Sequence, residues 1–177
     1  QVYDAFLDQY LHQARLHLDR IIAQVHDCRA HAVAEPFLAG TFPACLATGN
    51  DPWRGGCQRP VFMLFSGGIP TAADGLAAIR RVVFEDRCCT PAQLLEALRA
   101  DFVGHEELRQ RCLAAPKFGN DDAAADELAG DLARRFCRFV LDYPCAHPEG
   151  LWPALFSNVF NMFSRTVAAT PDGRRWG

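Results

Sequence analysis

The chain has 177 residues, with 18 Lys and Arg against 21 Asp and Glu, a formal net charge of -3 and 50% hydrophobic residues. This length suffices for one domain with a hydrophobic core. The near-neutral charge excludes the basic surface typical of proteins that bind nucleic acid or an anionic membrane. No stretch approaches the roughly 18 consecutive apolar residues of a membrane-spanning helix, and no export signal opens the chain, so we expect a soluble protein.

Eight cysteines are scattered along the chain without a C-x-x-C pair. A chain of this size folds without disulfides, and the scatter favours reduced thiols in a cytoplasm over a disulfide framework. The sequence begins with Gln1 and stops at Trp176-Gly177, directly after a turn signal. We therefore expect it to be part of a longer protein.

A long amphipathic helix is predicted at the start of the chain. Apolar residues recur at alternating steps of four and three, which places one stripe along a helix of about seven turns. The stripe consists of Leu7, Leu11, Ala14, Leu18, Ile21, Val25 and Cys28. Phe6, Tyr10 and Ile22 widen the stripe beyond a coiled-coil seam, so packing on a larger body is favoured over a coiled coil.

A Pro- and Gly-rich segment and a strand follow. Residues 33–56 predict loops and turns with at most one short helix, near residues 37–45. The apolar run 61–65 predicts a buried strand, and a helix is expected from Ala72 to about Phe84. Glycines between them suggest a phosphate site, but their spacing fits no common fingerprint and no Lys follows. A tight structural turn is favoured.

Two shorter helices are expected next. Thr90 as N-cap, Pro91 at the first helical position and Gln93 form a capping-box arrangement that opens a helix through Phe102. A short helix is expected over residues 106–114, where a proline follows two positions later.

A long helix is predicted to begin after Asn120 or Asp121 as N-cap and to reach Leu141. Its start holds an acidic cluster made of Asp121, Asp122, Asp126 and Glu127. Such a cluster suits a cation site or acid/base chemistry, but helix capping and the helix dipole explain it without a ligand. Capping is therefore favoured.

The last part of the chain predicts two short strands, over residues 155–159 and 166–168. Thr170-Pro171-Asp172-Gly173 then has Pro at the second and Gly at the fourth position of a turn.

Taken alone, the residues point to no catalytic group and no metal site. His26, Cys28 and His31 lie close together, but a structural zinc site needs four ligands and no second cluster has suitable spacing. The Cys145-Ala146-His147 triplet and the adjacent Cys88-Cys89 pair are explained as buried or idle thiols. Ser66 lies beside glycines, but the sequence places no His and acid around it.

Several passages, taken in order, resemble one family. They are Pro36-Phe37-Leu38, the segment 49–56, Asp74-Gly75-Leu76-Ala77-Ala78-Ile79-Arg80 with Val83-Phe84, the segment 94–102, Pro116-Lys117-Phe118-Gly119-Asn120-Asp121-Asp122 and Ala169-Thr170-Pro171-Asp172-Gly173-Arg174-Arg175. The G-N-D-D and A-T-P-D-G-R motifs around a long helix are specific. The chain is similar to the glycyl radical enzymes, the superfamily of pyruvate formate-lyase and of the radical diol and hydroxyproline dehydratases.

The resemblance implies an α/β fold that is mostly helical in this segment, as part of a ten-stranded α/β barrel with outer helices. Residues 1–177 would be a partial pyruvate formate-lyase-like domain from the later-middle part of the barrel. In this family a glycyl radical generates a thiyl radical on a cysteine in a central loop. Neither a Gly-Cys-x-Glu loop nor the glycyl motif occurs in this sequence, so we expect both centres outside the chain, which alone would be inactive.

The resemblance also suggests where substrate lies. Ser157 and Asn158, just before the final turn, are the expected substrate-binding residues, with satisfaction of loop backbone groups as the alternative. The sequence departs from the family pattern at Cys57-Gln58-Arg59-Pro60 and at residues 65–70. These departures predict an unusual substrate or a diverged, inactive parent.

The resemblance implies radical dehydration or lyase cleavage of a C–O, C–N or C–C bond in a small polar substrate. It implies a glycyl radical outside this chain, installed by an activating enzyme that uses S-adenosylmethionine and an iron-sulfur cluster. An anaerobic, cytoplasmic homodimer is expected, with no nucleic acid, membrane or bound metal. The alternatives are a non-catalytic scaffold derived from the same fold, and a helical binding module that presents the Leu7 to Cys28 stripe.

Overall fold

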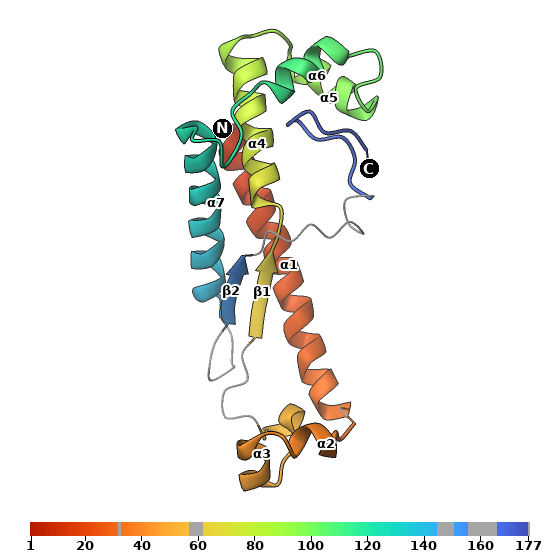
Figure 1. The fold of residues 1–177 in the computed structure, drawn as a ribbon, viewed down its shortest axis with the longest axis vertical. Helices are drawn as coiled ribbons and strands as arrows, with labels where there is room; N and C mark the ends of the chain where they lie inside the picture. Colours follow the sequence, from red (N-terminus) through yellow and green to blue (C-terminus); the bar gives the residue numbers. More distant parts are fainter. Residues whose placement is uncertain (32, 57–61, 145–150, 156–165, 177) are drawn as a thin grey trace. The chain divides into compact units, whose positions relative to one another are not determined.

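The computed structural model describes residues 1–31, 33–56, 62–144, 151–155 and 166–176 (Figure 1). The chain divides into two compact units. The first unit comprises Gln1–Leu64 and Arg138–Pro153, and the second comprises Phe65–Cys137 and Ala154–Gly177. Helices dominate the described residues and strands are few, which agrees with the predicted α/β class in a mostly helical segment.

The first unit is built around α1, Val2–His31, which spans 30 residues and confirms the predicted long helix. Leu7, Ala14 and Leu18 of the stripe are buried, whereas Ile21 is 38% exposed. Among the stripe residues whose side chains the structure describes, the buried ones therefore lie between Leu7 and Leu18.

A charged side chain joins α1 to the segment that re-enters this unit after residue 137. The guanidinium of Arg15 lies 5.6 Å from the ring centroid of Phe139 and 5.5 Å from that of Tyr143. The Tyr143 hydroxyl donates a hydrogen bond to Asp19, and this bond is the main reason why the pKa of Tyr143 is raised. Cation–π attraction and a charge-assisted hydrogen bond therefore both connect α1 to the segment after residue 137.

The Pro- and Gly-rich segment forms more helix than the sequence predicts. Instead of at most one short helix it contains α2, Pro36–Ala39, α3, Pro43–Thr48, and the 3-10 turn η1, Pro52–Arg54. A proline opens each of them, because its fixed φ suits the first helical turn and no N–H is lost there. Asp51 caps η1, since its carboxylate accepts from the backbone N–H of Trp53 at 3.0 Å.

Two strands form a two-stranded sheet, β1, Phe62–Ser66, and β2, Leu151–Leu155. Figure 1 shows them side by side and pointing the same way. The strand predicted over 61–65 is confirmed within the described residues, but its predicted burial is only partly correct, because Leu64 is buried whereas Met63 is 53% exposed and Phe65 59%. A strand forms at 151–155, and residues 156–159 of the strand predicted over 155–159 lie outside the described residues. The strand predicted over 166–168 is wrong because these residues adopt turn and irregular backbone.

The second unit begins with α4, Ile69–Ile79, which starts before the predicted Ala72 because Pro70 occupies its first turn. It continues into a π-helical turn, η2, Arg80–Glu85. Next is α5, Pro91–Arg99, whose predicted capping box is confirmed: Thr90 Oγ1 accepts from Gln93 N at 3.2 Å, and Gln93 Oε1 accepts from Thr90 N at 2.8 Å. It ends before the predicted Phe102.

Next are α6, Glu106–Leu113, in the second unit, and α7, Ala123–Leu141, which belongs to the first unit from Arg138 onward; both are close to their predicted ranges. The residue that caps α7 differs from the prediction: Asp122, not Asn120 or Asp121, accepts from the backbone N–H of Ala124 at 3.0 Å. The core of the second unit contains Val82, Val83, Cys89, Leu94, Ala97, Phe102 and Cys112.

Candidate functional site

The A-T-P-D-G-R motif folds into a closed turn, residues 168–176, called the C-terminal turn here. Gly173 N donates to Thr170 O at 3.0 Å, which confirms the predicted turn, and Thr170 N donates to Arg174 O at 3.0 Å. The Thr170 hydroxyl also hydrogen-bonds Asp172 Oδ1. Gly173 has a φ of 96°, a value that L side chains rarely adopt.

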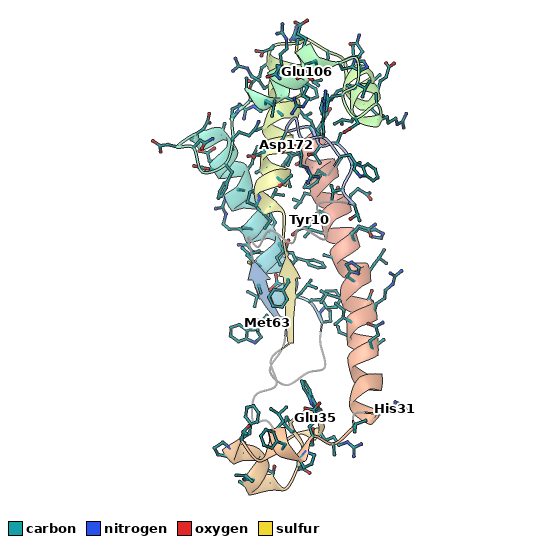
Figure 2. The ribbon with its side chains drawn as sticks, turned by 45° about the vertical axis from the view of Figure 1, so that its right-hand side comes forward. Tyr10, His31, Glu35, Met63, Glu106 and Asp172 are labelled. Atoms are coloured by element: carbon teal, nitrogen blue, oxygen red, sulfur yellow. The ribbon has the colours of Figure 1, made fainter. Side chains whose placement is uncertain are left out.

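Helix α6 holds the C-terminal turn by charge-assisted hydrogen bonds. Arg109 Nε donates to Gly173 O at 2.9 Å, and Arg175 Nη2 donates to Glu106 Oε2 at 2.7 Å. Hydrogen bonds from Gln110 and Arg109 lower the pKa of Glu106 below its usual value. Glu106 and Arg109 are three residues apart, so they lie on one face of α6. Glu106 and Asp172 of this unit are labelled in Figure 2.

The C-terminal turn also packs closely on α6 and α4. A Cβ on Gly173 would lie 2.7 Å from Leu113 Cγ, so a larger residue at this position would force Leu113 to move. A Cβ on Gly75 of α4 would lie 3.6 Å from Pro171 Cδ, which is ordinary contact. The turn is thus seated against both helices.

The segment that carries the G-N-D-D motif is anchored to α4 and α7 by carboxylates. Phe118 N donates to Asp74 Oδ1 at 2.6 Å, and Gly119 N donates to Asp126 Oδ1 at 2.9 Å. Lys117 Nζ donates to the backbone oxygens of Cys112 at 2.8 Å and Ala115 at 3.1 Å. Asp122 caps α7, as the capping interpretation predicts, whereas Asp126 lies within the helix and binds a backbone N–H of the preceding segment.

Asp74 is the point where three separated motifs meet. Burial raises the pKa of its carboxyl group, and the neighbouring carboxylates of Asp172 and Asp126 raise it further. The hydrogen bond from Phe118 N and the charge of Lys117 oppose this shift. Residues 74, 118 and 172 come from α4, the G-N-D-D segment and the C-terminal turn, so we call this arrangement the motif junction.

A hollow of about 240 Å³ lies along α4, η2 and the start of α7. Its charged lining residues are Arg80, Arg81, Glu85 and Asp122. Arg80 pairs with Glu85 at 2.7 Å, and Arg81 pairs with Asp86 at 2.9 Å. Because carboxylates neutralise both guanidinium groups, the hollow does not form a basic anion site.

The predicted substrate-binding residues, Ser157 and Asn158, lie outside the described residues. The same holds for Cys57, for the Cys145-Ala146-His147 triplet and for the side chains of His26 and Cys28. Within the described part of the chain, no group of three or more His, Cys, Asp or Glu side chains could hold a metal ion. No helix in that part is both long and apolar enough to cross a membrane.

The sequence by itself did not identify the residues that form long-range hydrogen bonds around the C-terminal turn and the motif junction. Asp74 lies in one of the family motifs, but its bond to Phe118 spans 44 positions. Glu106 and Arg109 lie outside those motifs, and the one available signal was their i, i+3 spacing. The motif junction and the bonds from α6 together bring carboxylates, backbone N–H groups and arginines around the C-terminal turn, and these residues include no nucleophile with an adjacent base.

Comparison with known proteins identifies relatives over most of the chain. The family model described as pyruvate formate lyase-like matches residues 1–157. The isethionate sulfite-lyase of Bilophila wadsworthia is 39% identical over 110 residues, which is 60% of this chain and 13% of that enzyme.

Solved structures give the same result for the fold. The B12-independent glycerol dehydratase of Clostridium butyricum in its glycerol-bound form has a TM-score of 0.79 at 28% identity and matches 99% of this chain. The hydroxyproline dehydratase of Clostridioides difficile, with trans-4-hydroxy-L-proline bound, has a TM-score of 0.80 at 26% identity and matches 98%. This chain spans 23% and 22% of the two dehydratase chains, respectively.

Proposed function

Because the chain belongs to the pyruvate formate lyase-like family, we propose that it forms part of the barrel of a glycyl radical enzyme. The reaction would be radical dehydration or lyase cleavage of a small polar substrate. The observation that carries this proposal is the fold similarity to two dehydratases over nearly the whole chain. The names of these two relatives contain glycerol and hydroxyproline, which supports a small polar substrate.

The motif junction would serve this function by fixing the segment that leads out of the substrate region. Residues 157 and 158 precede the C-terminal turn by about a dozen positions. Arg109, Glu106 and Leu113 hold this turn, so they fix the position at which the chain continues after residues 157 and 158. We propose that Ser157 and Asn158 contact substrate and that the junction is their structural support.

The radical groups would come from outside residues 1–177. The glycyl radical supplies the hydrogen-abstracting chemistry of such enzymes, and a closed cavity protects the intermediates from side reactions. We propose a cytoplasmic homodimer activated by a separate enzyme that uses S-adenosylmethionine and an iron-sulfur cluster. The family match includes residues 7–28, so the first helix is assigned to the enzyme fold and not to a separate binding module.

The first test is the reading frame that contains this chain. The proposal expects a Gly-Cys-x-Glu loop and a C-terminal glycyl motif in the same polypeptide. If the frame encodes neither, the protein is instead a non-catalytic scaffold derived from this fold.

The second test uses the full-length protein made with an activating enzyme under anaerobic conditions. Electron paramagnetic resonance should detect a glycyl radical, and a panel of small diols, hydroxyamino acids and hydroxysulfonates should reveal a substrate. Ser157→Ala and Asn158→Ala should lower kcat/KM by about tenfold or more while the radical signal persists. Thr71→Ala, at an exposed position of α4, is the matched control and should leave kcat/KM unchanged.

A further inference from the structure

The adjacent cysteines Cys88 and Cys89 follow an irregular end of a helix. The turn η2 is π-helical, and Asp86 N donates to Arg81 O at 2.8 Å in the five-residue pattern of that helix. Arg87 then has a φ of 51°, in the left-handed region that residues other than Gly seldom adopt. This reversal of the backbone places Cys88 and Cys89 against η2.

Both thiols are directed at one backbone oxygen. Cys88 Sγ lies 3.2 Å from Val82 O, and Cys89 Sγ lies 3.9 Å from the same oxygen. Burial raises the pKa of Cys89, and the Cys88 thiol raises it further by its charge and by a hydrogen bond between the two side chains. Both sulfur atoms therefore lie within contact distance of one acceptor, which brings them near enough to each other for one small ligand to reach both.

One cysteine of the pair is exposed to solvent and the other is buried in the core. Cys88 is exposed, whereas Cys89 is buried at 9% exposure in the core cluster with Val83, Leu94 and Phe102. Arg111 lies within electrostatic range of the Cys88 thiol. A ligand from solvent would meet Cys88 first and then close onto Cys89, with apolar side chains behind it.

We propose that Cys88 and Cys89 form a two-thiol binding site for trivalent arsenic compounds. Thiolate sulfur is a soft ligand that prefers soft centres. Two thiols suffice because a trivalent arsenic atom that carries one organic group has two exchangeable positions. Cys112, in the same core cluster, is fully buried, so it is not available as a third ligand.

The binding step balances without an oxidant. With phenylarsine oxide, the arsenic–oxygen bonds break, two arsenic–sulfur bonds form, and the oxygen leaves as water with the two thiol protons. Arsenic stays trivalent and the sulfur atoms are not oxidised. The thiolate is the attacking form of each cysteine, so the exposed Cys88 is expected to react first, and Cys89, whose pKa burial raises, closes the second arsenic–sulfur bond.

The test is intact mass spectrometry of the reduced 177-residue chain with equimolar phenylarsine oxide. One phenylarsenic group should bind with loss of two thiol protons, withstand excess monothiol and be removed by a dithiol. Trypsin cleaves after Arg87 and Arg99, and the peptide 88–99 contains only these two cysteines, so the adduct should map to that peptide.

Cys88→Ser should abolish the monothiol-resistant adduct, and because Cys88 is exposed this variant should keep its fold. Cys137→Ser, at a half-buried cysteine of α7, is the matched control and should bind as the unsubstituted chain does. An adduct that maps elsewhere, that monothiol removes or that survives Cys88→Ser would overturn the proposal. The result does not depend on the proposed enzymatic function.

Discussion

Gly173 shows how a single residue determines the packing of the C-terminal turn. Its φ is 96°, and a Cβ added there would lie only 2.7 Å from Leu113 Cγ, which makes two separate constraints on the same position. Gly104 provides a comparison, because its φ is 78° but a Cβ would meet nothing within 4 Å. Comparing substitutions at Gly173 and Gly104 therefore distinguishes the cost of backbone strain from the cost of steric overlap.

We expect Gly173→Ala to lower the free energy of unfolding by about 2–4 kcal/mol, since strain and overlap act together. Gly104→Ala should cost about 1 kcal/mol, from strain alone. Urea unfolding of both variants measures the difference. Equal losses at the two positions would mean that Leu113 does not confine the turn.

Cys112 gives a prediction about pH. Burial raises the pKa of its thiol to about 11. A group whose pKa is raised on folding contributes stability that is fully present below its unfolded pKa and is lost as pH rises through the folded value. The unfolding free energy should therefore fall between about pH 9 and about pH 11.

Urea unfolding at about pH 8 and about pH 10.5 checks this dependence. Cys112→Ala should reduce the loss between the two pH values, whereas Cys137→Ala, at a less buried cysteine, should preserve it. If Cys112→Ala leaves the full loss in place, its thiol is not the group responsible.

At the scale of the element, the start of α7 shows where local sequence reasoning succeeds and where it fails. The capping box of α5 is predicted correctly because all its partners lie within three residues of Thr90. The start of α7 offers three consecutive candidates, Asn120, Asp121 and Asp122, and each has a side chain suited to capping. The choice depends on backbone direction, which the bonds of Phe118 and Gly119 to Asp74 and Asp126 fix.

Asp122→Ala should destabilise the protein by about 1 kcal/mol, because it removes the acceptor for Ala124 N at the helix start. Asn120→Ala is the matched control at an exposed position and should change stability by less than about 0.5 kcal/mol. Thermal unfolding followed by circular dichroism compares the two. A larger effect of Asn120→Ala would mean that Asn120, one of the two caps predicted from the sequence, caps the helix and Asp122 does not.

At the scale of the whole molecule, the exposed apolar residues of the strands agree with the family assignment. Met63 is 53% exposed, Phe65 59% and Trp152 53%. A two-stranded sheet is rarely stable by itself in water, and apolar strands with uncovered faces are association sites. These exposures are what we expect of strands that take further neighbours in a complete barrel.

The isolated chain should therefore self-associate through its strands. Phe65→Ser should raise the monomer fraction seen by sedimentation velocity, because it removes an apolar side chain from β1. Phe37→Ser, at a 90% exposed aromatic residue of α2, is the control. A monomeric parent chain, or an equal effect of both substitutions, would contradict association through the sheet.

The sequence by itself determined the elements and the family. Apolar periodicity, capping residues and prolines act over one to four positions, so they placed α1, α5, α6 and β1 within a few residues of their observed bounds. The ordered motifs were sufficient to identify the family of the chain, which the family match over residues 1–157 confirms.

Tertiary structure alone decided which residues meet. The bond from Phe118 N to Asp74 spans 44 positions, and that from Arg109 to Gly173 spans 64. Long-range pairs depend on how several helices pack, and no local periodicity encodes that arrangement. The convergence of Cys88 and Cys89 on Val82 O is local in sequence, but it requires the π-helical turn and the reversal at Arg87, neither of which was predicted from the sequence.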